Sequence, residues 1–241
     1  AGKRGEVTLN RFKAAFFDLD GTLVFSDPDP WDVFPQFARA EGLTFADSAA
    51  RDGERYVNFY FAGDQVQRDT ARLGEEGAAL ALTLGTLRAM RCEGDVAKAA
   101  RGIRARFKAW RSERVIPPGT IETLKQVKAR GYIVGLVTNR RHAEMNGHFH
   151  DLGLAPYFDF TVNSEEAGAP KPDRVMFALA LERAGVRAHE TIHIGDNYYA
   201  DVVGAERMGI AQVLMDPKGL FPEAGCPVIH TLPEVEAYLF A

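Results

Sequence analysis

The stretch FFDLDGTLV, residues 16–24, places two aspartates at the end of a run that is otherwise almost wholly apolar. Successive side chains of an extended segment point to opposite faces, so Asp18 and Asp20 share one face. Phe17 and Leu19 share the other. Two carboxylates this close repel each other and raise each other's proton affinity unless a cation or a shared proton offsets their charge. The stretch therefore predicts a positively charged partner elsewhere in the chain.

Short apolar runs recur along the chain, and each leads into a turn and then a helical pattern. This alternation is typical of a parallel sheet flanked by helices. We therefore expect an α/β fold with a doubly wound parallel sheet. The runs are residues 14–17, 132–137, 158–162, 191–194 and 211–214.

The segment that follows the first run has a different pattern, with several helix-like stretches and almost no strand-like one. Asp29 and Pro30 can begin a helix. Residues 96–110 carry apolar side chains at alternating steps of four and three, which is typical of a helix packed on another helix. We expect a helical module over residues 25–114, inserted into a core formed by residues 1–24 and 115–241.

Helix boundaries are also readable in the core. Apolar residues at helical spacing over residues 121–127 predict a helix that Gly131 ends. Pro172 is expected to open a helix that closes at Gly185. The last pattern, residues 232–240, predicts another short helix.

Composition limits the classes of function. A formal net charge of -4 gives no general attraction to nucleic acid or acidic membranes, so neither is an expected partner. Cys92 and Cys226 lie far apart, which predicts neither a disulfide framework nor a cysteine zinc site. Residues 1–13 lack the apolar core of a signal peptide, and no apolar run approaches the roughly 20 residues that span a bilayer. We expect a soluble, cytoplasmic protein, and the sequence does not indicate its oligomeric state.

Polar residues collect where the expected strands end. In open α/β sheets, ligands bind in the crevice at the carboxyl ends of the strands. Asp18, Asp20, Thr138 and Asp196 all lie at or just beyond such an end. This coincidence predicts that they meet at one site.

Four short strings belong to this pattern. They are DLDGT at 18–22, TNR at 138–140, KPD at 171–173 and GDNYYAD at 195–201. As a set, in this order and spacing, they resemble the four motifs of the haloacid dehalogenase-like (HAD) hydrolases. The resemblance covers residues 14–24 and about 115–241, and implies a Rossmann-like core. In the branch similar to phosphoglycolate phosphatase, a helical cap follows the first strand, where residues 25–114 stand here.

The resemblance implies roles for the two aspartates of the first string. A carboxylate can attack phosphorus to form an aspartyl-phosphate, which splits hydrolysis into two steps. Asp18 is the expected nucleophile. Asp20 is expected to protonate the leaving oxygen and later to take a proton from the attacking water. Thr22 supplies a hydroxyl that is expected to brace the loop.

The other strings are expected to supply a cation and hydrogen-bond donors. Asp196 can join Asp18 in holding Mg²⁺, for which oxygen ligands are typical. The resemblance adds the main-chain carbonyl of Asp20 as a ligand and Asp201 as a support behind the site. The predicted cofactor is therefore Mg²⁺.

Two further strings are expected to bind the phosphoryl group. Lys171 would stand near Asp18 as a compact positive charge that restrains both the nucleophile and the phosphate. The hydroxyl of Thr138 and the backbone groups around Asn139 would bind phosphoryl oxygens. The predicted substrate is a small phosphorylated metabolite, selected by the cap.

Alternatives remain open. Within the superfamily, an acid at position 20 favours phosphate esters over dehalogenation. A sugar phosphomutase similar to β-phosphoglucomutase keeps that acid, although Thr22 favours a phosphatase. A non-catalytic, metal-dependent phospho-acceptor switch also gathers acidic residues, a hydroxyl and a lysine at strand ends, but it leaves the large insertion unexplained.

Other patterns are interpreted as structural. His142, His148 and His150 do not have the spacing of a known metal motif. The basic residues between 101 and 111 are expected on a solvated helix face. The aromatic residues between 56 and 61 are expected mainly in the core of the cap.

Overall fold

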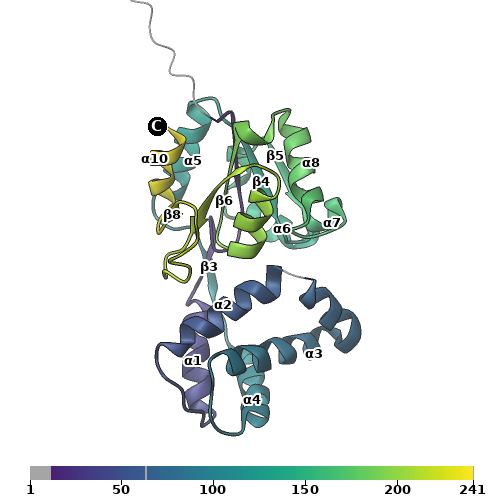
Figure 1. The fold of residues 1–241 in the computed structure, drawn as a ribbon, viewed down its shortest axis with the longest axis vertical. Coiled ribbons are helices and arrows are strands. Elements are labelled where there is room, and N and C mark those ends of the chain that lie inside the picture. Colours follow the sequence, from purple (N-terminus) through teal and green to yellow (C-terminus); the bar gives the residue numbers. More distant parts are fainter. Residues whose placement is uncertain (1–11, 63, 241) are drawn as a thin grey trace, which may run out of the picture.

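The computed structural model describes residues 12–62 and 64–240. The stretch without a signal-peptide core therefore lies, up to Arg11, outside the described residues. An α/β half and a helical half are stacked along the long axis of the molecule (Figure 1). Within the described part of the chain, no helix combines the length and the apolar character needed to cross a bilayer.

The α/β half is built on a parallel sheet, which confirms the predicted fold class. The described residues form six strands in the order β5-β4-β1-β6-β7-β8. The central strand β1 (Ala14–Phe17) pairs with β4 (Ile133–Thr138) on one side and with β6 (Thr191–Gly195) on the other. The next strands of the sheet along the chain, β4 and β5, thus lie on one side of β1, and the later strands β6, β7 and β8 lie on the other. Such a reversal is where ligands bind in sheets of this kind. The outer strands are β5 (Phe160–Asn163), β7 (Ala211–Met215) and β8 (Val228–Ile229).

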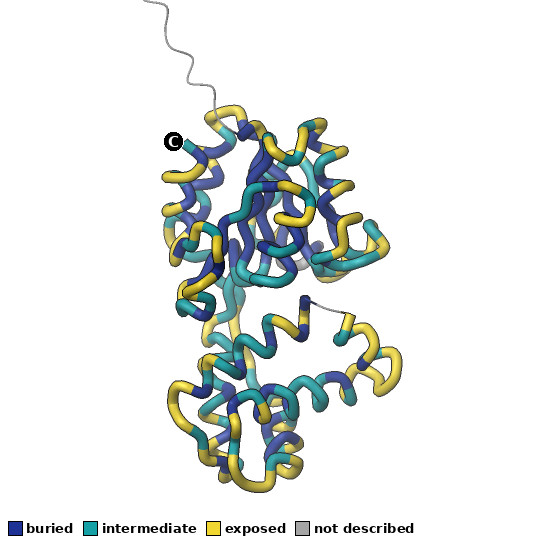
Figure 2. Tube along the Cα trace, in the orientation of Figure 1, coloured by how far each residue is buried: buried dark blue, intermediate teal, exposed yellow. Residues whose placement is uncertain are grey.

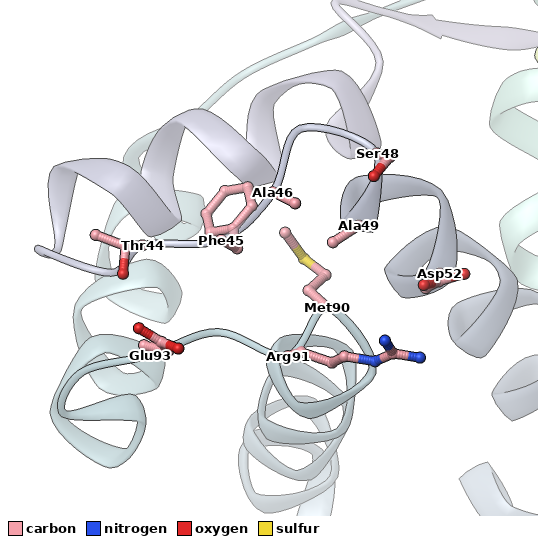
Figure 3. Close-up of a pocket in the computed structure, with 9 residues that line it drawn as sticks. All are labelled: Thr44, Phe45, Ala46, Ser48, Ala49, Asp52, Met90, Arg91 and Glu93. Atoms are coloured by element: carbon pink, nitrogen blue, oxygen red, sulfur yellow. The ribbon is translucent and has the colours of Figure 1, made fainter.

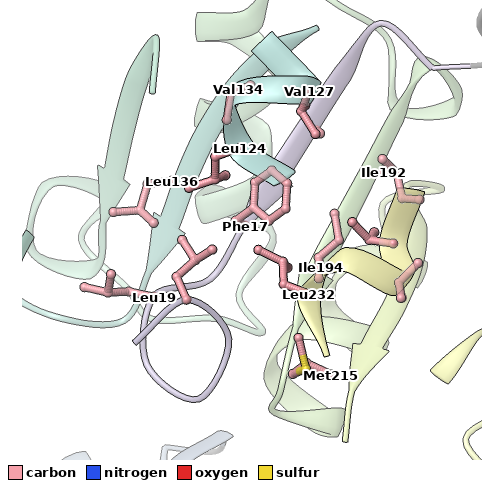
Figure 4. Packing of buried hydrophobic residues seen from close by; sticks show 14 of the residues in the cluster. Phe17, Leu19, Leu124, Val127, Val134, Leu136, Ile192, Ile194, Met215 and Leu232 are labelled. Atoms are coloured by element: carbon pink, nitrogen blue, oxygen red, sulfur yellow. The ribbon is translucent and has the colours of Figure 1, made fainter. Parts of the chain in front are cut away.

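Helices cover both faces of the sheet, which explains why β1 is continuously apolar. Phe17 packs with Leu124 of α5 (Thr120–Ala129) in a cluster on one face (Figure 4). Phe16 packs with Met176 of α8 (Arg174–Ala184) on the opposite face. The remaining core helices are short: α6 (His142–Phe149), α7 (Ser164–Ala167), α9 (Gly204–Glu206), α10 (Glu236–Leu239) and a π-helical segment (Tyr198–Val203).

The helical half has its own apolar core. Asp29 caps its first helix as predicted, since its Oδ1 accepts a hydrogen bond from Trp31 N at 2.7 Å. Ala100 and Ile103 are buried in this core. Dark, buried residues line the inner sides of the helices, and exposed residues cover the outside (Figure 2). The helices are α1 (Pro30–Ala40), α2 (Ala49–Ala62), α3 (Gln65–Ala89) and α4 (Val96–Ala109).

The structure differs from an entirely helical insertion at its two ends. There, β2 (Phe25–Asp27) and β3 (Glu113–Val115) pair as an antiparallel ribbon that joins the two halves. Each strand has three residues, and its partner lies far away in the sequence. A periodic pattern cannot be read from so short a segment.

Two predicted helix boundaries also differ. Helix α8 begins at Arg174, beyond Pro172, because the side chain of Asp173 caps it by accepting a hydrogen bond from Val175 N at 3.0 Å. Its last residue is Ala184 and Gly185 caps it, so it closes at Gly185 as predicted. Residues 232–240 divide into a 3₁₀ turn (Leu232–Val235) and α10.

Candidate active site

Three neighbouring strands bring the predicted site residues together. Asp18 follows β1, Thr138 ends β4, and Asp196 follows β6. Because these strands are parallel and adjacent, their carboxyl ends lie at the same edge of the sheet. The helical half faces this edge (Figure 1).

Lys171 is the positively charged partner predicted for Asp18, the first aspartate of the first string. Its Nζ lies 2.8 Å from Asp18 Oδ1 and 2.6 Å from Asp201 Oδ1. Its side chain is 1% exposed, so the charge is removed from solvent. Burial opposes the charged form of Lys171, but the two carboxylates raise its pKa above the ordinary value. The ammonium group therefore bridges two buried carboxylates.

Asp201 is held from several sides. Its Oδ2 accepts a hydrogen bond from Asn197 N at 3.0 Å, and its Oδ1 lies 2.8 Å from His193 Nε2. Burial opposes ionisation of Asp201, but Lys171 and the hydrogen bond from His193 lower its pKa to about 2. Burial also lowers the pKa of His193, which favours the neutral form of its imidazole. We had not predicted His193, although a histidine within an apolar run was a signal for a buried hydrogen bond.

The two carboxyl groups closest to the strand ends, those of Asp18 and Asp196, have raised pKa values. Burial, opposed by Lys171 and reinforced by Asp201, raises the pKa of Asp18 to about 7. Burial, and then the charges of Asp18 and Asp201, raise the pKa of Asp196 well above its ordinary value. Both shifts are the response expected of buried carboxylates that repel one another and that a single lysine only partly compensates.

These carboxylates have the chemistry of a site for a hard divalent cation. Oxygens of Asp18, Asp196 and Asp201 lie within 4.8 Å of one another. Such an oxygen set suits Mg²⁺, and a cation there would relieve the repulsion. Because Asp201 already binds Lys171 and His193, it lies beside the cation position predicted between Asp18 and Asp196.

Gly21 makes room for Asp196. Its φ is +72°, a conformation that side chains rarely adopt, and a Cβ at this position would overlap the Asp196 carboxylate. The absence of a side chain at Gly21 therefore matters for the contact between two loops. It lets the loop after β1 approach the loop after β6.

We expect Gly21→Ala to displace Asp196 and weaken binding of a divalent cation. Gly131→Ala is the matched control, because Gly131 also has a positive φ, +81°, but has no atom within 4 Å of the added Cβ. Both variants should lose about 1–2 kcal/mol of stability through backbone strain. Isothermal titration with Mg²⁺ should show weaker binding only for Gly21→Ala. Equal affinity in the two variants would contradict this role for Gly21.

The side chain of Asp20 is bound by two arginines. Arg114 Nη1 donates to Asp20 Oδ1 at 2.6 Å, and Arg140 Nη2 donates to the same oxygen at 2.8 Å. Arg140 Nε also donates to Oδ2. We had not predicted either arginine in the site. Arg140 belongs to the quoted TNR string, but nothing local marked Arg114.

The side-chain amide of Asn139 has a role that the sequence did not predict. Its side-chain Oδ1 accepts a hydrogen bond from Lys171 N at 2.7 Å, and its Nδ2 donates to Lys171 O at 3.1 Å. The amide therefore fixes the loop that carries Lys171. Only the backbone groups around Asn139 remain for the predicted contact with phosphate.

The two predicted hydroxyl groups are both buried. Thr138 Oγ1 accepts a hydrogen bond from Arg140 N at 3.3 Å, and the residue lies at the strand end as predicted. The Thr22 hydroxyl has no hydrogen-bond partner among the described residues, so the expected bracing of the loop is not seen.

Helix α2 of the helical half contacts the site directly. Asn58 Nδ2 donates to Asp196 O at 3.4 Å, and Asn197 Nδ2 donates to Asn58 O at 2.9 Å. Phe59 is 55% exposed and meets Tyr199 edge to face at 5.3 Å between ring centroids. The expectation that the aromatic residues serve mainly the core of the helical half therefore holds for buried Tyr60 but not for Phe59.

Charged residues also join the two halves. Lys218 Nζ, in the loop after β7, lies 2.8 Å from Asp29, 2.9 Å from Asp32 and 3.0 Å from Glu54. Burial raises the pKa of Glu54, against the effect of Lys218. Arg51 donates to the carbonyl of Lys218 at 3.1 Å. Polar contacts therefore place α2 over the strand ends.

A cavity of about 460 Å³ lies elsewhere, within the helical half (Figure 3). Met90 points into it, and Asp52 and Arg91 stand at one side. None of its lining residues comes from the strand ends. The chemistry predicted from the sequence belongs to the sheet edge and not to this cavity.

Comparison with known proteins agrees with this geometry. A family model described as haloacid dehalogenase-like hydrolase matches residues 12–209. The chain belongs to this family. The predictions of the superfamily and of a hydrolase are thereby confirmed.

Relatives of this HAD hydrolase include proteins named as phosphatases. Ribulose-1,5-bisphosphate 5-phosphatase of Halopiger xanaduensis is 32% identical over 210 residues, which cover 85% of this chain and 84% of that protein. Glyceraldehyde 3-phosphate phosphatase of Methanocaldococcus jannaschii is 35% identical over 96 residues, which cover 40% of this chain and 42% of that protein. These names agree with the predicted phosphoric monoester hydrolase.

Solved structures share the fold. The crystal structure of a HAD phosphatase from Thermococcus onnurineus has a TM-score of 0.60 and 24% identity, and the match covers 95% of this chain and 98% of that chain. At this identity the likeness concerns the fold alone. It extends over the helical half as well as the sheet.

Proposed function

We propose that this HAD hydrolase is a Mg²⁺-dependent phosphatase that hydrolyses a small phosphorylated metabolite through an aspartyl-phosphate. The observation that carries the proposal is the buried bridge of Lys171 between Asp18 and Asp201, with Asp196 beside it. A nucleophilic carboxylate, a fixed cation and an acidic group suited to Mg²⁺ are the parts that phosphoryl transfer requires.

In the proposed first step, Asp18 attacks phosphorus and the bond to the leaving oxygen breaks. Lys171 holds the attacking carboxylate and offsets charge on the phosphoryl oxygens. Thr138 and the backbone around Asn139 would bind those oxygens. Mg²⁺, bound by Asp18, Asp196 and the carbonyl of Asp20, would supply further charge neutralisation and orientation.

Proton transfer is assigned to Asp20. It would protonate the leaving oxygen in the first step and take a proton from water in the second, when water attacks the aspartyl-phosphate. Asp201 does not touch the reacting atoms in this scheme. Its role is to hold Lys171 in place, with His193 and Asn197 N holding Asp201 in turn.

The substrate class rests on the helical half and on the relatives. Asn58 and Phe59 lie over the site, so this half restricts access to the strand ends. Relatives are named for ribulose 1,5-bisphosphate and glyceraldehyde 3-phosphate, which are both small phosphorylated metabolites. A cytoplasmic location and the lack of a nucleic-acid or membrane partner stay predictions from the sequence.

The first test of the proposal is turnover of p-nitrophenyl phosphate with Mg²⁺, and loss of turnover with a chelator. Sustained release of phosphate would exclude a phospho-acceptor switch that is modified once. Absence of turnover in Mg²⁺ would overturn the proposal. Incubation with hexose phosphates separates the phosphomutase, which would form an isomer without releasing phosphate.

Mg²⁺ is expected to raise the Tm more at about pH 7.5 than at about pH 5. The pKa of Asp18 is raised to about 7 by burial, so the folded protein keeps a proton there that the unfolded chain releases above about pH 4. The free energy of unfolding of the metal-free protein should therefore decrease as the pH rises from about 4 to about 7. The decrease is a few kcal/mol in order of magnitude. Protons also compete with the metal at the lower pH. Differential scanning fluorimetry with and without Mg²⁺ measures this, and an equal shift at both pH values would contradict it.

A further inference from the structure

The arrangement around Asp20 contains more positive charge than Asp20 balances. Arg114 and Arg140 each form an ion pair with this one carboxylate, at 2.6 Å for Arg114 and with two donors from Arg140. Glu144 is a distant second partner for Arg140, at 3.8 Å, and it is exposed. Two guanidinium groups thus converge on a single carboxylate.

Both guanidinium groups remain open to a ligand. Their side chains are 26% exposed for Arg114 and 24% exposed for Arg140. Arg114 comes from β3, in the ribbon between the two halves, and Arg140 comes from the loop after β4. The pair therefore stands between the strand ends and the helical half, where a bound metabolite would lie.

The position of Asp20 indicates which part of the substrate the two arginines would contact. On the phosphoryl side, Lys171 is already committed to Asp18 and Asp201. Asp20 serves the leaving group in the proposed function. Arg114 and Arg140, which bind the Asp20 carboxylate, therefore lie on the side of the site where the leaving group would be. Planar guanidinium forks bind carboxylate and phosphate oxygens in pairs, which suits them to an anion there.

We propose that Arg114 and Arg140 bind a second anionic group of the substrate, a phosphate or a carboxylate on its leaving-group part. This group takes over the guanidinium donors that Asp20 occupies in the free enzyme and leaves the Asp20 carboxylate free to face the leaving oxygen. The inference rests on the proposed function and narrows it. The preferred substrates are small phosphate esters that carry another anion.

Two matched pairs of compounds test the proposal. Ribulose 1,5-bisphosphate is compared with ribulose 5-phosphate, and glycolate 2-phosphate with ethyl phosphate, always with Mg²⁺. The wild-type enzyme should show a higher kcat/KM for the member with the extra anion in at least one pair. A preference confined to the first pair assigns the anion as phosphate, and one confined to the second assigns it as carboxylate.

In the pair where the wild type shows a preference, the ratio compares kcat/KM of the member with the extra anion with kcat/KM of the member without it. Arg114→Gln and Arg140→Gln should each lower this ratio by about tenfold. The loss should come mainly from a higher KM for the member with the extra anion. Arg140→Lys should restore part of the ratio because it keeps the charge. Arg111→Gln is the control, since Arg111 is exposed and its guanidinium donates to the carbonyls of Lys108 and Trp110. Its ratio should not change.

A ratio separates substrate recognition from mere positioning of Asp20, because a displaced Asp20 would slow both members of a pair equally. Unchanged ratios in both glutamine variants, or no preference in the wild type, would overturn the inference. Hydrolysis of p-nitrophenyl phosphate in that case would leave the proposed function standing. An enzyme that hydrolyses none of these esters would overturn both.

Discussion

Asp18→Asn is expected to lower turnover of p-nitrophenyl phosphate by more than about 1,000-fold, as in other enzymes that lose a covalent nucleophile. The amide keeps the shape of the side chain but cannot form the acyl-phosphate. Stability should move in the opposite direction. Asp18 is a buried carboxyl whose pKa is raised to about 7, so the charged form is costly near neutral pH without metal. We expect the metal-free variant to melt at or above the wild-type temperature at about pH 7.5.

Asp151→Asn is the control for this variant, because Asp151 is an exposed aspartate outside the site. It should keep wild-type turnover and wild-type melting. Phosphate release and Tm are measured on the same preparations. Turnover by Asp18→Asn above about one hundredth of wild type would exclude Asp18 as the nucleophile.

Lys171→Met is expected to reduce both turnover and stability. The substitution leaves the Asp18 and Asp201 carboxylates buried without the ammonium that bridges them. Removing one partner from a buried ion pair typically costs about 3–5 kcal/mol. Urea unfolding should therefore show a lower midpoint with an unchanged slope, and turnover should fall because the nucleophile and phosphate lose their shared cation.

Lys13→Met provides the comparison between a buried and an exposed ion pair. Lys13 Nζ lies 2.6 Å from Glu190, yet the lysine side chain is 64% exposed. Exposed pairs contribute at most about 1 kcal/mol, so this variant should unfold near the wild-type midpoint. A midpoint for Lys171→Met as high as that of Lys13→Met would contradict the importance assigned to the buried bridge.

Much of the fold could be predicted because the local pattern of apolar residues reflects which faces of a strand or helix are covered by other elements. Both Phe16 and Phe17 are buried, on opposite faces of β1, and this produces the uninterrupted apolar run that indicated a central parallel strand. Gly185 ended a helix as expected, because its left-handed conformation suits a glycine. The ribbon of β2 and β3 could not be predicted, because its stability depends on a pairing between distant three-residue segments.

The candidate site was only partly readable. Asp18, Thr138 and Asp196 were identifiable because each stands where an apolar strand ends. The backbone groups around Asn139 were expected near phosphate, but nothing in the sequence indicated that its side-chain amide binds the backbone of Lys171. A sequence string names the residue and its place on the chain, whereas its hydrogen-bond partners depend on which loops meet.

The sequence by itself indicated five strands of the sheet, the helical character of the segment after the first strand and the acids at the strand ends, because backbone periodicity and turn chemistry act over a few residues. Only the tertiary structure decided that Arg114 and Arg140, 94 and 120 positions from Asp20, would converge on its carboxylate. It likewise decided that Lys171 would be buried between two acids. Such pairings arise when packing removes charged groups from water and leaves them only each other as partners.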